Sequence, residues 1–72
     1  MDELEMLSVV ALVKDIPERG LRRGQVGTIV ETLAPGVYEV EFSDDAGRTY
    51  ASLALPAYQL MRLYHEVQHH AA

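Results

Sequence analysis

The histidines and the glutamate of residues 65–69 are the side chains with the clearest potential for chemistry. The segment reads His-Glu-Val-Gln-His, and on a helix this spacing places two imidazoles on one face, where they can bind zinc beside a glutamate base. A hydrolytic zinc site also needs a third ligand, a cleft and neighbours that orient the ligands. We therefore expect no metalloenzyme. Adventitious metal binding by His65, His69 and His70 leaves a metal-binding protein as a remote alternative.

The serines and the paired carboxylates offer no catalytic arrangement. Ser8, Ser43 and Ser52 each fall in an expected strand or turn, and every histidine lies in the tail, so a Ser-His-Asp triad would require the tail to fold over the body. Asp44 and Asp45 are adjacent in an expected turn, where such residues accept hydrogen bonds from nearby backbone amides. We predict a non-enzymatic protein that needs no cofactor.

Residues 17–31 are the most informative stretch, because a basic, turn-rich loop leads there into a strand interrupted by glycine. Gly20 and Gly24 indicate turns. Gly27, inside a β-branched run, indicates a bulge or a close approach of a neighbouring backbone. Leu21 is the only large apolar side chain of the loop, and we expect it to pin the loop onto the body.

Five segments have the pattern of short β-strands: residues 7–14, 25–32, 37–42, 48–54 and 58–63. The first is apolar on both faces, which is typical of a central strand. In the third, alternation places Tyr38, Val40 and Phe42 on one face, toward the core. Turn-forming residues fill the gaps, with Ala-Pro-Gly at 34–36, Ser-Asp-Asp-Ala-Gly at 43–47, and a proline that favours a 3₁₀ turn before the last strand.

A long first loop, a three-stranded meander, a 3₁₀ turn and a closing strand together resemble the SH3-like barrel. We therefore predict an all-β protein, a five-stranded SH3-like barrel over residues 1–63, with closure limiting its exposed edges. Residues 64–72 are expected to form a polar, histidine-containing tail that is flexible or helical.

The resemblance extends to residue types. Over residues 6–63 the chain looks like a family of short, stand-alone bacterial proteins classed as a domain of unknown function. The matching segments are Ser-Val-Val-Ala-Leu at 8–12, Asp-Ile-Pro-Glu-Arg-Gly-Leu at 15–21, Arg-Gly-Gln-Val-Gly-Thr-Ile-Val-Glu at 23–31, Tyr-Glu-Val-Glu-Phe at 38–42, Gly-Arg-Thr-Tyr-Ala at 47–51 and Gln-Leu at 59–60. The family implies an SH3-like barrel and no assigned activity. Residues 23–31 are also similar to the KOW motif of ribosomal and transcription-elongation proteins.

Composition indicates a single small domain. The chain has 72 residues, 49% of them hydrophobic, and no cysteine. So much apolar surface in a short chain makes a homodimer plausible, and the lack of cysteine fits a reducing cytoplasm. An acidic N-terminus and the lack of an apolar run near about 20 residues argue against a secretory signal or a membrane span.

Charge directs the choice of partner. The net charge of -5 disfavours nonspecific binding to nucleic acids and anionic membranes. Lys14, Arg19, Arg22 and Arg23 nevertheless form a local basic cluster, whose simplest role is to keep the loop solvated. We expect a module that docks a protein partner through residues 15–25, the acidic hairpin or an exposed strand edge, in one form an antitoxin-like neutraliser. The candidate contacts are Arg19, Leu21, Arg22, Arg23, Asp44 and Asp45, and the alternative is a KOW-like RNA or DNA binder that uses the basic loop.

The aromatic side chains have two interpretations. Tyr50 and Tyr58 beside Asp44 and Asp45 are the ingredients of an SH3 groove for proline-rich peptides. In a barrel this small, however, tyrosines are expected mostly to fill the core with their hydroxyl groups at the rim.

Overall fold

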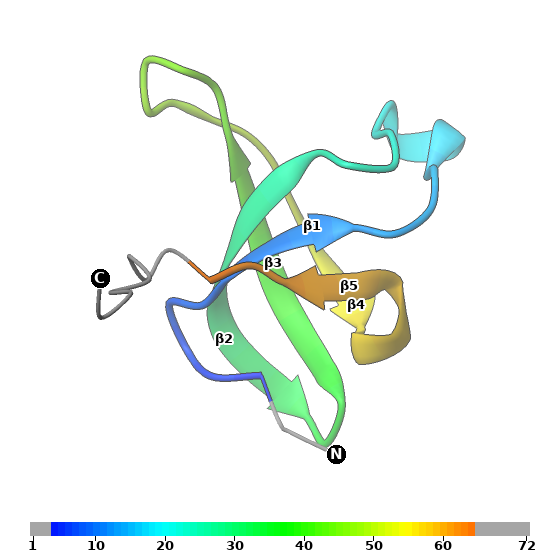
Figure 1. Ribbon diagram of the computed structural model, residues 1–72, viewed down its shortest axis with the longest axis vertical. Coiled ribbons are helices and arrows are strands. Elements are labelled where there is room, and N and C mark those ends of the chain that lie inside the picture. The colour runs from blue at the N-terminus through cyan, green and yellow to red at the C-terminus, as the bar shows by residue number, and fades with distance from the viewer. Residues whose placement is uncertain (1–3, 65–72) are drawn as a thin grey trace, which may run out of the picture.

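The computed structural model describes residues 4–64 and contains five β-strands and two short 3₁₀ turns (Figure 1). The predicted tail, with its three histidines, lies outside the described residues except for Tyr64. The elements are β1 (Val9–Leu12), η1 (Pro17–Arg19), β2 (Val26–Ala34), β3 (Val37–Ser43), β4 (Thr49–Pro56), η2 (Ala57–Gln59) and β5 (Leu60–Arg62). No helix among these residues is long and apolar enough to cross a lipid bilayer.

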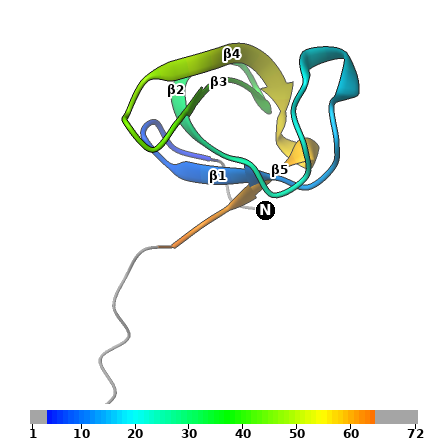
Figure 2. The same cartoon turned by 90° about the horizontal axis from the view of Figure 1, so that it is seen from above.

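All strands belong to one antiparallel sheet in the order β4-β3-β2-β1-β5. The strand order and the 3₁₀ turn before β5 confirm the predicted SH3-like barrel, and the sheet curls into the open ring seen in Figure 2. β1 is central, as predicted, but it begins at Val9 and not at residue 7. Leu7 adopts a left-handed conformation with φ 68°, which interrupts an extended strand.

The core lies inside this ring and draws on every strand. Its buried residues are Val10, Leu12, Ile16, Leu21, Ile29, Tyr38, Val40, Phe42, Leu53, Leu55 and Leu60. The predicted inward face of β3 is confirmed, because Tyr38, Val40 and Phe42 are all buried. Since Ile16 and Leu21 come from the long loop, residues 13–25, that loop is part of the packed structure.

Gly27 makes possible the close contact of β2 with β3. It lies opposite Phe42 on one side and Val10 on the other. A Cβ atom at Gly27 would come within 2.7 Å of Cγ1 of Val40 and 2.9 Å of the carbonyl oxygen of Glu41. Gly27 is therefore a site of close approach, while the bulges of β2 occur after Ile29 and after Thr32.

Both predicted hairpin turns are present. The β2–β3 turn consists of Pro35 and Gly36, and Gly36 has φ +75°, as glycine allows in the second central position of a tight turn. In the β3–β4 hairpin, residues 44–48, one carboxylate oxygen of Asp44 accepts bonds from the amides of Ala46 and Arg48, both at 2.9 Å.

The sheet does not close through backbone pairing among the described residues, contrary to the expectation that closure limits exposed edges. β4 and β5 are the two ends of the strand order, and each has one unpaired edge. β5 has only three residues, whereas β4 has eight. Just after the C-terminal end of β5, the amide of Leu63 donates to the carbonyl of Val9 at 2.8 Å.

Candidate protein-binding surfaces around the long loop

The long loop is held in a defined shape by its own backbone and by Leu21. Ile16 and Leu21 form an isolated antiparallel bridge across the loop. Leu21 is only 2% exposed, so the prediction that it pins the loop is confirmed. The amide of Gly24 donates to the carbonyl of Leu12 at 2.7 Å, which ties the returning arm of the loop to the end of β1.

Polar side chains fix the base of the loop. The carboxylate of Asp15 accepts a bond from the amide of Arg23 at 2.8 Å. Gln25 accepts from the amide of Arg22 and donates through Nε2 to the hydroxyl of Tyr50 at 3.0 Å. Tyr50 can reach Gln25 because it is an extra residue in β4: Phe42 pairs with Ala51 and Ser43 with Thr49, which leaves Tyr50 unopposed.

A cationic hollow lies on one side of the loop. It has a volume of about 550 Å³ and is lined by Val13, Lys14, Asp15, Arg22 and Arg23. Within residues 4–64 the only ion pair joins Arg48 to Asp44, at 3.4 Å. The charges of Lys14, Arg22 and Arg23 therefore have no carboxylate partner in the part of the chain that the structure describes.

An apolar hollow adjoins the cationic one, because both are lined by Val13 and Arg23. It measures about 340 Å³, and its other lining residues are Ala11, Leu12, Gly24 and Met61. Ala11 pairs with Val26 on β2 and with Met61 on β5. These three residues thus form one row across the outer face of the sheet, and Met61 is 52% exposed.

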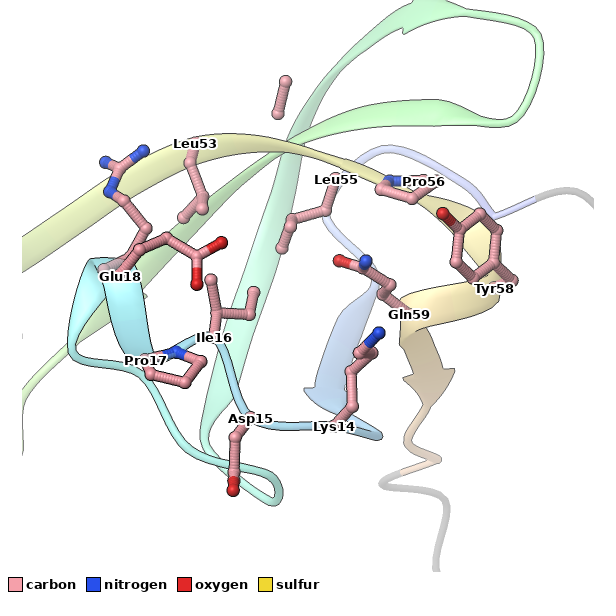
Figure 3. A pocket seen from close by; sticks show the side chains of 12 residues that line it. Lys14, Asp15, Ile16, Pro17, Glu18, Leu53, Leu55, Pro56, Tyr58 and Gln59 are labelled. Carbon is pink, nitrogen blue, oxygen red and sulfur yellow. The ribbon is translucent and has the colours of Figure 1, made fainter.

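A groove lies on the other side of the loop (Figure 3). Its volume is about 590 Å³, one wall is residues 14–19, the other is residues 53–56, and Tyr58 and Gln59 form one end. Figure 3 shows Glu18 and Ile16 pointing from the loop toward β4, whereas Asp15 points away. Leu53, Leu55 and Ile16 at its base are buried, and Tyr58 is 77% exposed.

The predicted contact residues do not form one site. Arg19 lines the groove, Arg22 and Arg23 line the cationic hollow, and Leu21 is too buried to be a contact. Asp44 and Asp45 lie on the β3–β4 hairpin, which projects from the barrel away from the long loop (Figure 1). Asp44 is engaged in capping that turn, as the sequence analysis expected of adjacent aspartates.

The predicted SH3 groove for proline-rich peptides is not assembled. Tyr58 lines the groove together with Pro56, but Tyr50, Asp44 and Asp45 do not line it. The expectation that tyrosines mostly fill the core is wrong, because only Tyr38 is buried while Tyr50, Tyr58 and Tyr64 are exposed. The bulge turns Tyr50 toward Gln25, and η2 places Tyr58 on the outside.

The predicted histidine cluster lies outside the described residues. Within residues 4–64, no three His, Cys, Asp or Glu side chains are placed to hold a metal ion. Sequence reasoning missed Met61 and the wall formed by residues 53–56. A signal for the apolar hollow was present in β1 and the residue that follows it, because the alternate residues Val9, Ala11 and Val13 are all apolar.

The fold and its surfaces define a small SH3-like barrel with two candidate binding surfaces beside its long loop. The chain belongs to the family described as Domain of unknown function (DUF4926), whose model matches residues 6–62. No curated protein and no solved structure matches the chain significantly.

Proposed function

We propose that this protein is a non-enzymatic binding module that docks an acidic, partly apolar segment of a protein partner against the long loop. The cationic hollow carries the proposal, because three cationic side chains and a single acidic residue, Asp15, line it, and none of the three cations forms an ion pair within residues 4–64. Arginine binds carboxylates through two parallel hydrogen bonds, which supports recognition of an acidic segment.

The adjoining apolar hollow supports a protein partner over a nucleic acid. Val13 and Met61 expose apolar surface directly beside Arg23. An apolar side chain next to a carboxylate would fill both hollows, whereas a phosphate backbone would leave the apolar one empty. The overall charge of -5 also opposes nonspecific association with phosphates.

The proposal extends to the kind of partner interaction and to the location of the protein. An antitoxin-like neutraliser, which covers a surface of a neighbouring protein, is one form that such a module takes. A reducing cytoplasm fits a sequence without cysteine.

The second candidate function is RNA or DNA binding through Lys14, Arg22 and Arg23. These residues line a single hollow, and residues 23–31 are similar to the KOW motif. In this case phosphate groups would occupy the cationic hollow and Met61 would take no part.

The test is a pull-down from host lysate, with and without nuclease, that compares Arg23→Glu, Met61→Ser and the control Arg48→Glu. Protein docking predicts a discrete protein band that survives nuclease, weakens in the first two variants and persists in the control. Arg48→Glu is the control because it makes the same change of charge as Arg23→Glu, but on the distant hairpin. Nucleic-acid binding predicts bands lost on nuclease treatment, a steep loss with salt, and no effect of Met61→Ser. The latter pattern would overturn the proposal.

A further inference from the structure

The free edge of β4 faces the groove and has no backbone partner there among residues 4–64. β4 ends the sheet, so half of its amide and carbonyl groups point away from β3. No backbone hydrogen bond joins residues 53–56 to residues 14–19 in the described chain. Residues 14–19 therefore lie beside this edge without forming hydrogen bonds to its backbone groups.

The lining of the groove identifies it as a slot along the strand edge. Successive residues of a strand point to opposite faces of a sheet. The groove nevertheless touches four consecutive residues of β4, Leu53, Ala54, Leu55 and Pro56. Only a space along the edge meets all four, because a space above one face would meet every second residue.

We propose that an extended segment of a partner protein docks in this groove as an added strand on β4. The four lining residues span about 13 Å at the rise of a β-strand, which is room for about four residues of the incoming peptide. Main-chain hydrogen bonds to β4 supply the binding, as in other cases of strand addition. The groups that face this edge are the amide and carbonyl of Ala54 and the carbonyl of Pro56, which has no amide hydrogen. This surface shares Lys14 and Asp15 with the cationic hollow but does not include Arg22, Arg23 or Met61, so variants at those three residues distinguish the two surfaces.

Charges at the groove define the chemistry of the segment. Glu18 points from the loop toward β4, and Lys14 lies toward the end formed by Gln59 and Tyr58 (Figure 3). Neither has an ion-pair partner within residues 4–64. Asp15 and Arg19 also line the groove, and Asp15 points away from it (Figure 3). The incoming strand is therefore complementary when it carries a basic residue near Glu18 and an acidic residue near Lys14 or Arg19.

Two other occupants fit the groove less well. A second copy pairing through its own β4 would bring its own loop wall along the same edge, so that two loops would compete for one slot. A polyproline ligand needs a series of aromatic side chains, and Tyr58 is the only aromatic residue that lines this groove.

The experiment selects peptides that bind the full chain from a displayed library of random octapeptides. The affinity of the best peptide is then measured for the unmodified chain and for two matched variants, Ala54→Arg and Ser52→Arg. Both positions are exposed on β4, but only Ala54 lines the groove. We expect the first variant to weaken binding about tenfold or more and the second to leave it unchanged. Hydrogen exchange should show new protection of the amide of Ala54 in the complex, because the pairing of β4 with β3 leaves this N–H on the free edge, whereas the amides of Leu53 and Leu55 face β3. Thermal melting of both variants checks that the fold is retained.

A second selection uses the doubly substituted chain Lys14→Glu, Glu18→Lys. The expected result is a set of peptides in which the order of basic and acidic residues is reversed. Four outcomes would overturn the proposal. No peptide is selected, or the selected peptides are rich in proline. Alternatively, hydrogen-exchange protection is confined to Val13 and Met61, or protection of β4 appears without peptide and depends on protein concentration. These outcomes are independent of the pull-down with Arg23→Glu, so either surface can fail alone.

Discussion

At the level of single residues, Gly27 determines how closely β2 approaches β3. Its hydrogen faces Val40 and the backbone of Glu41, and Phe42 lies directly opposite. The sequence indicated either a bulge or a close approach at this position. It could not distinguish the two, because the choice depends on which side chains of β3 lie across from the glycine.

We expect Gly27→Ala to lower the free energy of unfolding by about 1–3 kcal/mol, the usual cost of overpacking a core. In a Val40→Ala background the added cost should be smaller, since Cγ1 of Val40 is removed, although the carbonyl of Glu41 remains 2.9 Å from the new Cβ. Urea unfolding of the four proteins in this double-mutant cycle measures both values. Strictly additive costs would contradict the proposed clash.

The two aspartates of the β3–β4 hairpin have different roles. Asp44 accepts two backbone hydrogen bonds and pairs with Arg48, whereas none of the described hydrogen bonds or ion pairs involves the side chain of Asp45. We expect Asp44→Ala to cost about 1 kcal/mol of stability and Asp45→Ala to leave it nearly unchanged. Thermal melting of both variants checks this, and equal effects would argue against the capping role.

At the level of elements, the long loop combines a packed side with an open side. Leu21→Ala should cost about 2–5 kcal/mol of unfolding free energy, because it removes a buried side chain from the core. Arg22→Ala, the next residue along, is exposed and should change stability by no more than about 0.5 kcal/mol. Denaturant unfolding gives both numbers. A small effect of Leu21→Ala would mean that the loop is not anchored by this residue.

The outer face of the β2–β3 pair places two like charges opposite each other. Glu31 pairs with Glu39, and the carboxylate of Glu39 accepts a 2.6 Å bond from the hydroxyl of Ser52. We expect Glu31→Lys to stabilise the protein by about 0.2–1 kcal/mol, since it replaces repulsion with attraction across the strands. Melting curves at low and high salt measure the gain, which should shrink with salt. A gain that does not depend on salt would point to another cause.

Strands and turns were largely predictable because their signals are local. Alternation in β3 correctly gave the buried set Tyr38, Val40 and Phe42, and Pro35 with Gly36 correctly gave the tight turn. The start of β1 was wrong by two residues, because the left-handed conformation of Leu7 is an exception for a branched apolar residue.

The surfaces were less predictable because they depend on neighbours distant in sequence. The sequence singled out the arginines but could not divide them between a groove and a hollow on different sides of the loop. It also could not show that Met61 lies beside Val13, or that β4 has a free edge. Each of these facts follows only from the order of strands in the sheet.

At the level of the whole molecule, β5 completes the small core of a protein whose free energy of unfolding is expected to be modest. It pairs with β1 and supplies Leu60, which packs among the eleven buried residues of the core cluster. A chain of this size is expected to be only about 5–15 kcal/mol more stable folded than unfolded. Pairing of the first strand with the last also joins residues far apart in sequence, which favours folding in milliseconds to seconds.

We therefore expect a chain ending at Gln59 to lose its cooperative thermal transition, while a chain ending at Tyr64 keeps it. The shorter chain exposes the free edge of β1 and the side of Leu12 that faces Leu60. Circular dichroism during heating distinguishes the two chains. A cooperative transition at an unchanged midpoint in the shorter chain would show that the first four strands fold without β5. The predicted homodimer stays a prediction, which sedimentation of the full chain would check.

The hydrogen bond from the amide of Leu63 to the carbonyl of Val9 extends the pairing of β5 with β1, so the first and last strands of the described chain are neighbours in the sheet. Residues 4–8 continue along the barrel, where the amide of Leu7 donates to the carbonyl of Ile29 and the amide of Leu4 to the hydroxyl of Tyr38. A unit whose first and last strands are neighbours can be inserted as a guest into an exposed loop of a host protein, provided that the guest includes residues 4–8 and that linkers span the remaining separation.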